Sequence, residues 1–119
     1  PLVRSYQTAE IASEVLGVEA AVEITDALVP GAEPAELLAT LASIDEERVL
    51  CTGHSPNLDR VVAASIGARF GSVFLKKCGT ACLDFAWGVA GGPRPGEPKA
   101  ELLWLLPPRV LRQLGRTPR

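Results

Sequence analysis

Hydrophobic residues recur with a helical period at the start of the chain and predict a helix over residues 1–16. The positions on one face of a helix with 3.6 residues per turn are Thr8, Ile11, Ala12, Val15 and Leu16. Gly17 suits the C′ position that ends such a helix, and Pro1 suits its first helical position. The residue that would cap this helix would precede Pro1, so we expect the sequence to open inside a motif.

Three shorter segments also have helical periodicity. Residues 34–43 place their leucines on one side, and residues 56–66 keep an apolar period up to Gly67. A last helix is predicted over residues 107–114, begun by two prolines. The pattern therefore predicts four helices.

Short apolar runs between these helices predict strands. The runs lie at residues 22–24, 48–53, 80–87 and 99–106. Residues 48–53 are apolar enough for burial on both faces of a sheet. The last two runs flank a segment dense in Gly and Pro, residues 88–98, which predicts a hairpin loop, and Pro30-Gly31 marks a turn. The order of elements predicts an α/β layer architecture with an antiparallel element at one edge.

Composition narrows the class of protein. The 119 residues suggest one domain, and 47% hydrophobic residues indicate a globular chain. A net charge of −2 argues against broad nucleic-acid binding, and no apolar run is long enough to span a bilayer. Three cysteines and no visible signal peptide favour a reducing cytoplasm. Cys78 and Cys82 have a zinc-like spacing, but one histidine leaves too few ligands, so we expect neither a metal nor a cofactor.

The single histidine, His54, stands where a predicted strand passes into a predicted helix. Ser55 suits the N-cap and Pro56 the first helical position, so we expect the helix to begin one residue after His54. Free backbone N–H groups at a helix start attract anions. His54 is therefore either part of an anion site together with Ser55, or a polar loop residue without a function.

Arg4 lies on the apolar stripe of the first predicted helix, with one end of its side chain expected to point inward. Arginine is seldom buried without a partner. One interpretation is an ion pair with a core carboxylate such as Asp84. The other is a guanidinium that binds phosphate oxygens in a planar, bidentate geometry. If the second holds, Arg4 and His54 converge on one anion.

Four segments resemble the histidine phosphatase superfamily. The segment "PLVRSYQTAEIA" is similar to its Ser-Pro-x-x-Arg-x-x-Gln-Thr-Ala segment, and "VLCTGHSPNLDRVVAASIG" to its second-histidine segment. The segments "LKKCGTACLDF" and "ELLWLLPPRVL" resemble the closing strands of its small branch, the SixA-like phosphohistidine phosphatases. The resemblance covers nearly the whole chain, with the segments in the family's order.

The resemblance implies a three-layer α/β/α fold of the phosphoglycerate-mutase-like kind. It also implies a phosphatase in which a first histidine, in an Arg-His-Gly motif, attacks the phosphoryl group and is transiently phosphorylated. Arg4 matches the second phosphate-binding arginine, and His54 matches the second histidine. The chain has no Arg-His-Gly motif, so we expect the family's N-terminal strand and nucleophile to be missing and this chain alone to be inactive.

The expected substrate is a phosphorylated protein, above all protein phosphohistidine, because the small branch lacks the insertions that carry a proton donor in the larger mutases. Lys76 and Lys77 either attract an acidic phosphoprotein or belong to a solvated loop. Two alternatives stay open, a general phosphomonoesterase acting on small phosphate-bearing substrates and a non-catalytic phosphate-binding domain. No nucleic-acid or membrane partner is expected, and the sequence does not determine the oligomeric state.

Overall fold

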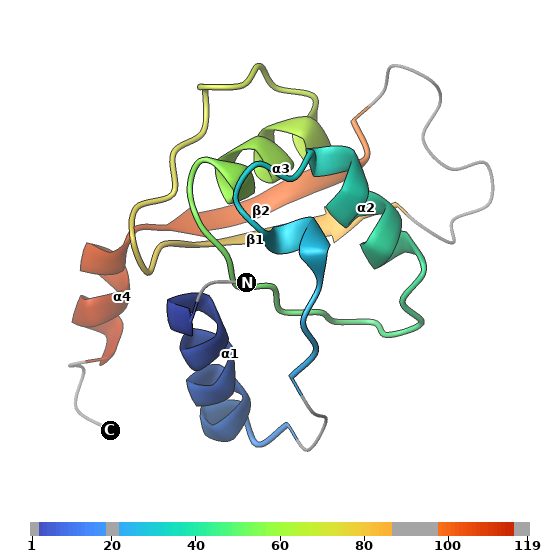
Figure 1. Cartoon of the computed structure of the whole chain (residues 1–119). Coiled ribbons are helices and arrows are strands. Elements are labelled where there is room, and N and C mark those ends of the chain that lie inside the picture. Colours follow the sequence, from blue (N-terminus) through green and yellow to red (C-terminus); the bar gives the residue numbers. More distant parts are fainter. Residues whose placement is uncertain (1–2, 19–21, 87–97, 116–119) are drawn as a thin grey trace. The chain divides into compact units, whose positions relative to one another are not determined.

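Helices and an antiparallel pair of strands make up the described part of the chain. The computed structural model describes residues 3–18, 22–86 and 98–115. The elements are α1 (Val3–Leu16), the short 3₁₀ helix η1 (Asp26–Leu28), α2 (Pro34–Ala42), α3 (Asn57–Ile66), β1 (Thr80–Phe85), β2 (Ala100–Leu106) and α4 (Pro108–Gly115) (Figure 1). The chain divides into two compact units, Pro1–Leu58 and Asp59–Arg119, and the boundary falls inside α3. The prediction of a mixed α and β fold is confirmed.

Two glycines end helices where the sequence predicts it. Gly17 follows α1 with φ of 68°, the left-handed conformation that glycine adopts without steric cost. The N–H of Val18 donates to the carbonyl of Ser13 at 3.0 Å, which completes a Schellman motif. Gly67 ends α3 in the same way, with φ of 73°. Helices α1 and α3 therefore end at the residues where the sequence predicts.

The core of the first unit forms between η1 and α2, which lie side by side (Figure 1). Leu37 and Leu38 of α2 and Ala27 of η1 are buried. The Thr25 hydroxyl caps η1 by accepting a hydrogen bond from the Ala27 N–H at 3.2 Å. The predicted turn at Pro30-Gly31 follows, with Gly31 at φ of 86°. The 3₁₀ helix itself is not predicted by the hydrophobic pattern.

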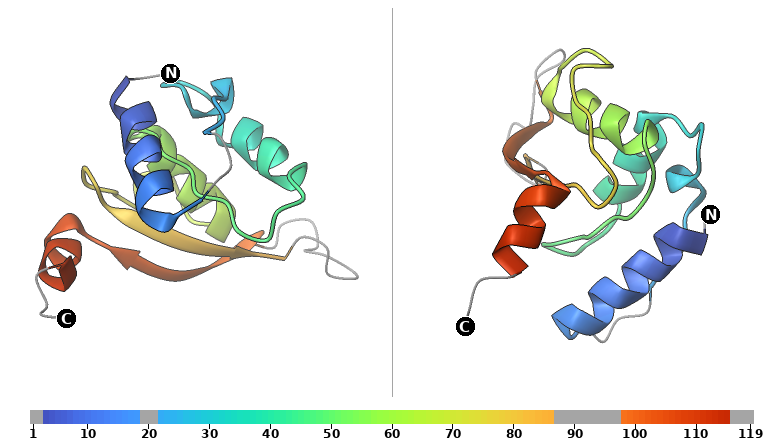
Figure 2. Two further views of the ribbon diagram at one scale, coloured as in Figure 1. Left: turned by 90° about the horizontal axis from the view of Figure 1, so that it is seen from below. Right: turned by 90° about the vertical axis from the view of Figure 1, so that its left-hand side faces the viewer.

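The second unit is built on β1, β2 and α3. The strands pair antiparallel from Thr80 opposite Leu106 to Phe85 opposite Ala100, with an irregularity in register after Cys82. Helix α3 lies along one face of this twisted pair (Figures 1 and 2). Its buried residues in this unit include Val61, Val62, Ala63 and Ser65. Most of the hairpin loop predicted at 88–98 lies outside the described residues.

The apolar stripe predicted on α1 is exposed. Ile11 is 62% and Val15 80% exposed, and no described residue of α1 is buried. The half-buried positions of this helix carry small side chains: Ser5, Ala9, Ala12 and Ser13. Small side chains let a helix approach its neighbour closely, and the helix therefore turns this face inward instead of the apolar one.

Two predicted strands do not form. Residues 22–24 and 48–53 have no strand structure, and Val49 and Leu50 are 47% and 57% exposed. A strand requires a neighbouring strand that pairs with its backbone. Within the described ranges, no hydrogen bond involves the backbone of residues 48–51. The burial predicted for this segment on both faces is therefore wrong. No described helix has the length and apolarity needed to cross a membrane.

Candidate functional site

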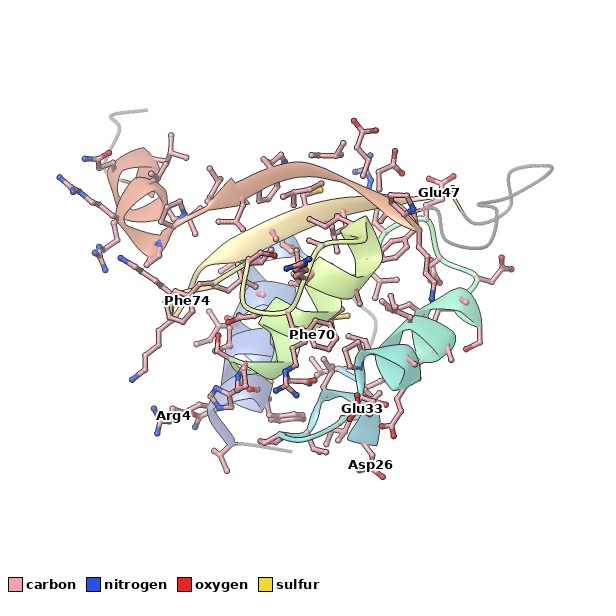
Figure 3. The ribbon with its side chains drawn as sticks, turned by 90° about the horizontal axis from the view of Figure 1, so that it is seen from above. Arg4, Asp26, Glu33, Glu47, Phe70 and Phe74 are labelled. Carbon is pink, nitrogen blue, oxygen red and sulfur yellow. The ribbon has the colours of Figure 1, made fainter. Side chains whose placement is uncertain are left out.

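Arg4 lies in the first turn of α1 and is exposed, not directed inward as the stripe predicts. Figure 3 shows its side chain extending away from the start of the helix. The carbonyl of Arg4 accepts a hydrogen bond from the Thr8 hydroxyl at 2.9 Å, which fixes the backbone of this turn. Arg4 has no ion pair with any described residue, and Asp84 is exposed, so the interpretation as a buried ion pair is wrong. The guanidinium is open to an external anion.

His54 lies at the entrance to α3 and is half-buried. Its carbonyl accepts a hydrogen bond from the N–H of Leu58 at 2.9 Å, which joins it to the first turn of the helix. Helix α3 begins at Asn57, one residue later than predicted, and Ser55 and Pro56 before it form a turn. Ser55 is exposed. The imidazole and the Ser55 hydroxyl therefore both belong to the short connection before the helix.

One hydrogen bond joins the segment of Arg4 to the segment of His54. The hydroxyl of Thr52 donates to the carbonyl of Ser5 at 2.8 Å, across 47 positions of the sequence. Ser5 follows Arg4 directly, and Thr52 precedes His54 by two residues. Both segments belong to the first unit. The two residues singled out by the sequence thus stand on backbone segments that are held together.

Gly53 packs closely against the start of α3. A Cβ at this position would lie 3.2 Å from Cγ of Leu58 and 3.5 Å from Cδ2 of Leu28. The contact with Leu58 is tighter than nine in ten real Cβ contacts, so a larger residue would require Leu58 to shift by a few tenths of an ångström. The absent side chain lets the segment pass close to the start of α3, and this path places His54.

Two further residues near His54 were not identified from the sequence as site residues. Asn57 is 3% exposed, and neither its Nδ2 nor its Oδ1 has a hydrogen-bond partner in the described structure. Such an unpaired buried amide costs about 1–3 kcal/mol. Thr52 carries the connection to α1. The place of Asn57 in "GHSPNLD" could have indicated that it lies near His54. No local pattern indicates that the hydroxyl of Thr52 binds the carbonyl of Ser5.

Two further observations concern the thiols and the metal-ligating side chains. Burial raises the pKa of the Cys51 thiol, so the neutral thiol predominates at neutral pH and is a poor nucleophile. In the described part of the chain no group of three or more His, Cys, Asp or Glu side chains could hold a metal ion. The arrangement offers hydrogen-bond donors and a fixed positive charge, which are the groups that bind an oxyanion.

Comparisons of the chain with protein-family models, with curated proteins and with solved structures find no match.

Proposed function

We propose that this chain supplies the phosphate-binding half of a histidine phosphatase active site, acting on protein phosphohistidine. The proposal rests on the hydrogen bond between Thr52 and Ser5. That bond joins the two segments whose sequences resemble the arginine and second-histidine motifs of the superfamily. An unrelated sequence that resembled these motifs by chance would have no reason to bring both segments together.

The proposed roles follow from the chemistry of the side chains. The guanidinium of Arg4 would bind two phosphoryl oxygens at once, and the imidazole of His54 would donate to a third. The Ser55 hydroxyl lies beside the start of α3, where helix N–H groups favour negative charge. In phosphoryl transfer, charge spreads over three equatorial oxygens in the transition state. Donors fixed beside these oxygens lower the barrier.

The covalent step would need a second histidine. His54 is the only histidine among the 119 residues and takes the second-histidine role. In the proposed reaction, an Arg-His-Gly histidine outside these residues attacks phosphorus and displaces the substrate histidine, which leaves as the free imidazole after protonation. Water then attacks the phosphoenzyme, releasing inorganic phosphate and restoring the nucleophile. The proposal places this activity in a reducing cytoplasm, which the odd number of cysteines favours.

The proposal includes a three-layer α/β/α fold of the phosphoglycerate-mutase-like kind. Support comes from residues 48–52, which include the apolar Val49, Leu50 and Cys51 and have no strand partner among the described residues. A strand laid beside this segment would pair with its backbone and cover Val49 and Leu50. The resemblance places such a strand, with the nucleophile, before Pro1.

Kinetics on the full product of the gene, including any residues encoded before Pro1, test this function. The substrate is a protein phosphorylated on histidine, and the phosphoenzyme is trapped as an acid-labile species. His54→Ala should lower turnover by about 100- to 1000-fold, the usual cost of one lost transition-state donor. Arg4→Ala should lower turnover and also weaken inhibition by phosphate, because its charge attracts the anion in both states. Arg48→Ala, which removes the other arginine of the first unit, is the matched control and should change neither. Wild-type turnover in His54→Ala would refute the assigned role.

A second candidate is a non-catalytic phosphate-binding domain, favoured by the absence of a second histidine from the 119 residues. The two candidates differ in one result. If the full gene product binds phosphate through Arg4 and His54 but forms no phosphoenzyme, the binding role stands and the phosphatase role falls. The chain starting at Pro1 should show negligible hydrolysis in either case, because losing a nucleophile costs several orders of magnitude.

A further inference from the structure

The acidic and basic residues of this chain are separated along the sequence. The first unit has ten acidic and two basic residues, whereas the second has four acidic and ten basic ones. The units therefore have formal net charges of −8 and +6, although the whole chain has only −2. Such asymmetry between the halves of a chain suggests that one of them has a charged partner.

The positive charge of the second unit is densest between residues 60 and 83, which include four basic residues and no acidic one. The four cations are exposed. Two phenylalanines in the same stretch are also exposed, Phe70 by 56% and Phe74 by 67%. We call these six residues the basic-aromatic surface: Arg60, Arg69, Phe70, Phe74, Lys76 and Lys77.

The fold holds both phenylalanines in place. The guanidinium of Arg60 lies 5.6 Å from the ring centroid of Phe70, a cation–π contact between α3 and the loop that follows it. The N–H of Leu75 donates to Oδ1 of Asp59 at 3.1 Å, and Asp59 is 8% exposed. This bond anchors the far side of the loop to α3. The aromatic side chains are therefore presented by a loop anchored at both sides.

The exposed side chains alternate with covered ones in the second half of the loop. Val73 and Leu75 are half-buried, whereas Phe74 and Lys76 between and after them are exposed. An extended backbone produces this alternation, since successive side chains point to opposite faces. Figure 3 shows the side chains of Phe70 and Phe74 at separate places along this loop. One face of the segment thus packs on its own unit while the other presents an aromatic ring next to a cation.

We propose that the basic-aromatic surface binds an acidic segment of another protein. Arginine and aromatic residues are enriched at the centres of protein interfaces, where a few side chains supply most of the affinity. The four cations complement carboxylates, and the phenylalanines offer apolar contact to a hydrophobic residue among them. The binding is independent of the proposed phosphatase activity, because it requires no phosphate on the partner.

A protein segment suits this surface better than an anionic membrane or a nucleic acid. Those polyanions extend well beyond four cations, and the chain as a whole has a net charge of −2. A short peptide responds mainly to charges within about 8 Å, the screening length at physiological salt. Among residues 59–77 the one carboxylate, Asp59, is buried and bound to the N–H of Leu75, so the field of the four exposed cations determines the binding of the peptide.

The test is an NMR titration of the 119-residue chain with a short peptide of Asp and Glu around one central Leu. Amide shifts should be confined to Arg60 and to residues 69–77, and they should weaken with added salt. Lys76→Glu combined with Lys77→Glu should reduce the affinity by about 10-fold or more, because attraction becomes repulsion at two positions. Phe74→Ser should weaken binding several-fold at unchanged charge. Arg109→Glu combined with Arg112→Glu, two exposed residues of α4 with the same total change of charge, is the control and should stay within about 2-fold.

Several results would overturn the proposal. One is the absence of shifts with the acidic peptide, and another is equal binding of a peptide with Asn and Gln in place of Asp and Glu. A third is unchanged affinity in the double lysine variant, whose fold is checked by circular dichroism. Binding of phosphatidylserine vesicles or of a short DNA duplex as tight as that of the peptide, at the same salt, would assign the surface to those ligands instead.

Discussion

Replacing Thr52 by valine removes the hydrogen bond that joins the two halves of the candidate site while keeping the shape of the side chain. The lost bond is 2.8 Å long and partly buried, and it leaves the carbonyl of Ser5 without this donor. A hydrogen bond of this kind contributes about 0.5–1.5 kcal/mol net. Because water can reach a partly buried carbonyl, we expect the free energy of unfolding to fall by about 1 kcal/mol, near the middle of that range.

Thr40→Val is the matched control. The Thr40 hydroxyl also donates to a backbone carbonyl, that of Glu36, at 2.9 Å. That bond is exposed and lies within one helix, where the same carbonyl accepts a main-chain N–H as well. The control substitution should therefore change the unfolding free energy by less than about 0.5 kcal/mol.

Urea denaturation and phosphate binding are measured on both variants. Thr52→Val should lower the denaturation midpoint and also weaken phosphate binding several-fold, because the hydrogen bond no longer joins the segment of Arg4 to the segment of His54. Equal midpoints in the two variants would show that the Thr52 bond contributes no stability. A lowered midpoint with unchanged phosphate affinity would show that the bond stabilises the first unit without positioning a phosphate site.

Four further predictions concern the surroundings of His54 and the thiols. Gly53→Ala should lower the free energy of unfolding by about 1–3 kcal/mol in urea denaturation, the usual cost of overpacking. The control Gly115→Ala, with nothing within 4 Å of the added Cβ, should not lower it. Equal stability of the two variants would show that Gly53 is not needed for packing. Asn57→Leu should leave the free energy of unfolding unchanged or raise it, because the substitution removes a buried unpaired amide. A decrease of that free energy by more than about 1 kcal/mol would mean that the amide has a partner in solution. Exposed Cys78 should react with a thiol reagent faster than Cys51, whose pKa is raised by burial. Burial raises the pKa of Cys51 in the folded chain, so the thiol ionises at lower pH in the unfolded chain. The free energy of unfolding should therefore decrease as the pH rises past the ordinary pKa of a thiol, and Cys51→Ala should reduce that decrease.

The sequence predicts the helices well because their signals are local. Apolar periodicity places α2 and α3, and glycines in the left-handed conformation end α1 and α3 where expected. The hairpin of β1 and β2 is likewise predicted by two apolar runs on either side of a Gly- and Pro-rich segment. Each of these elements is specified by residues within a few positions of it.

The failures concern features that depend on distant partners. Residues 48–53 have the composition of a buried strand, but strand structure depends on a neighbouring backbone that composition does not reveal. The stripe on α1 is exposed because the contact of Ser5 with Thr52 favours the face of small residues. That contact spans 47 positions, and no local pattern encodes it. Arg4 and His54 are candidate site residues through their motifs, and the sequence did not predict the hydrogen bond that joins their segments.

The central claim, that Arg4 and His54 bind one phosphate, is tested most directly through the imidazole resonances of His54. As the only histidine of the chain, it gives ring signals that need no further assignment. Titration with inorganic phosphate should shift these signals in a saturable way in the chain and in Arg48→Ala, and Arg4→Ala should abolish most of the shift. If the signals do not move on adding phosphate, or if they move equally in Arg4→Ala, the two residues do not share an anion and the proposed site is wrong.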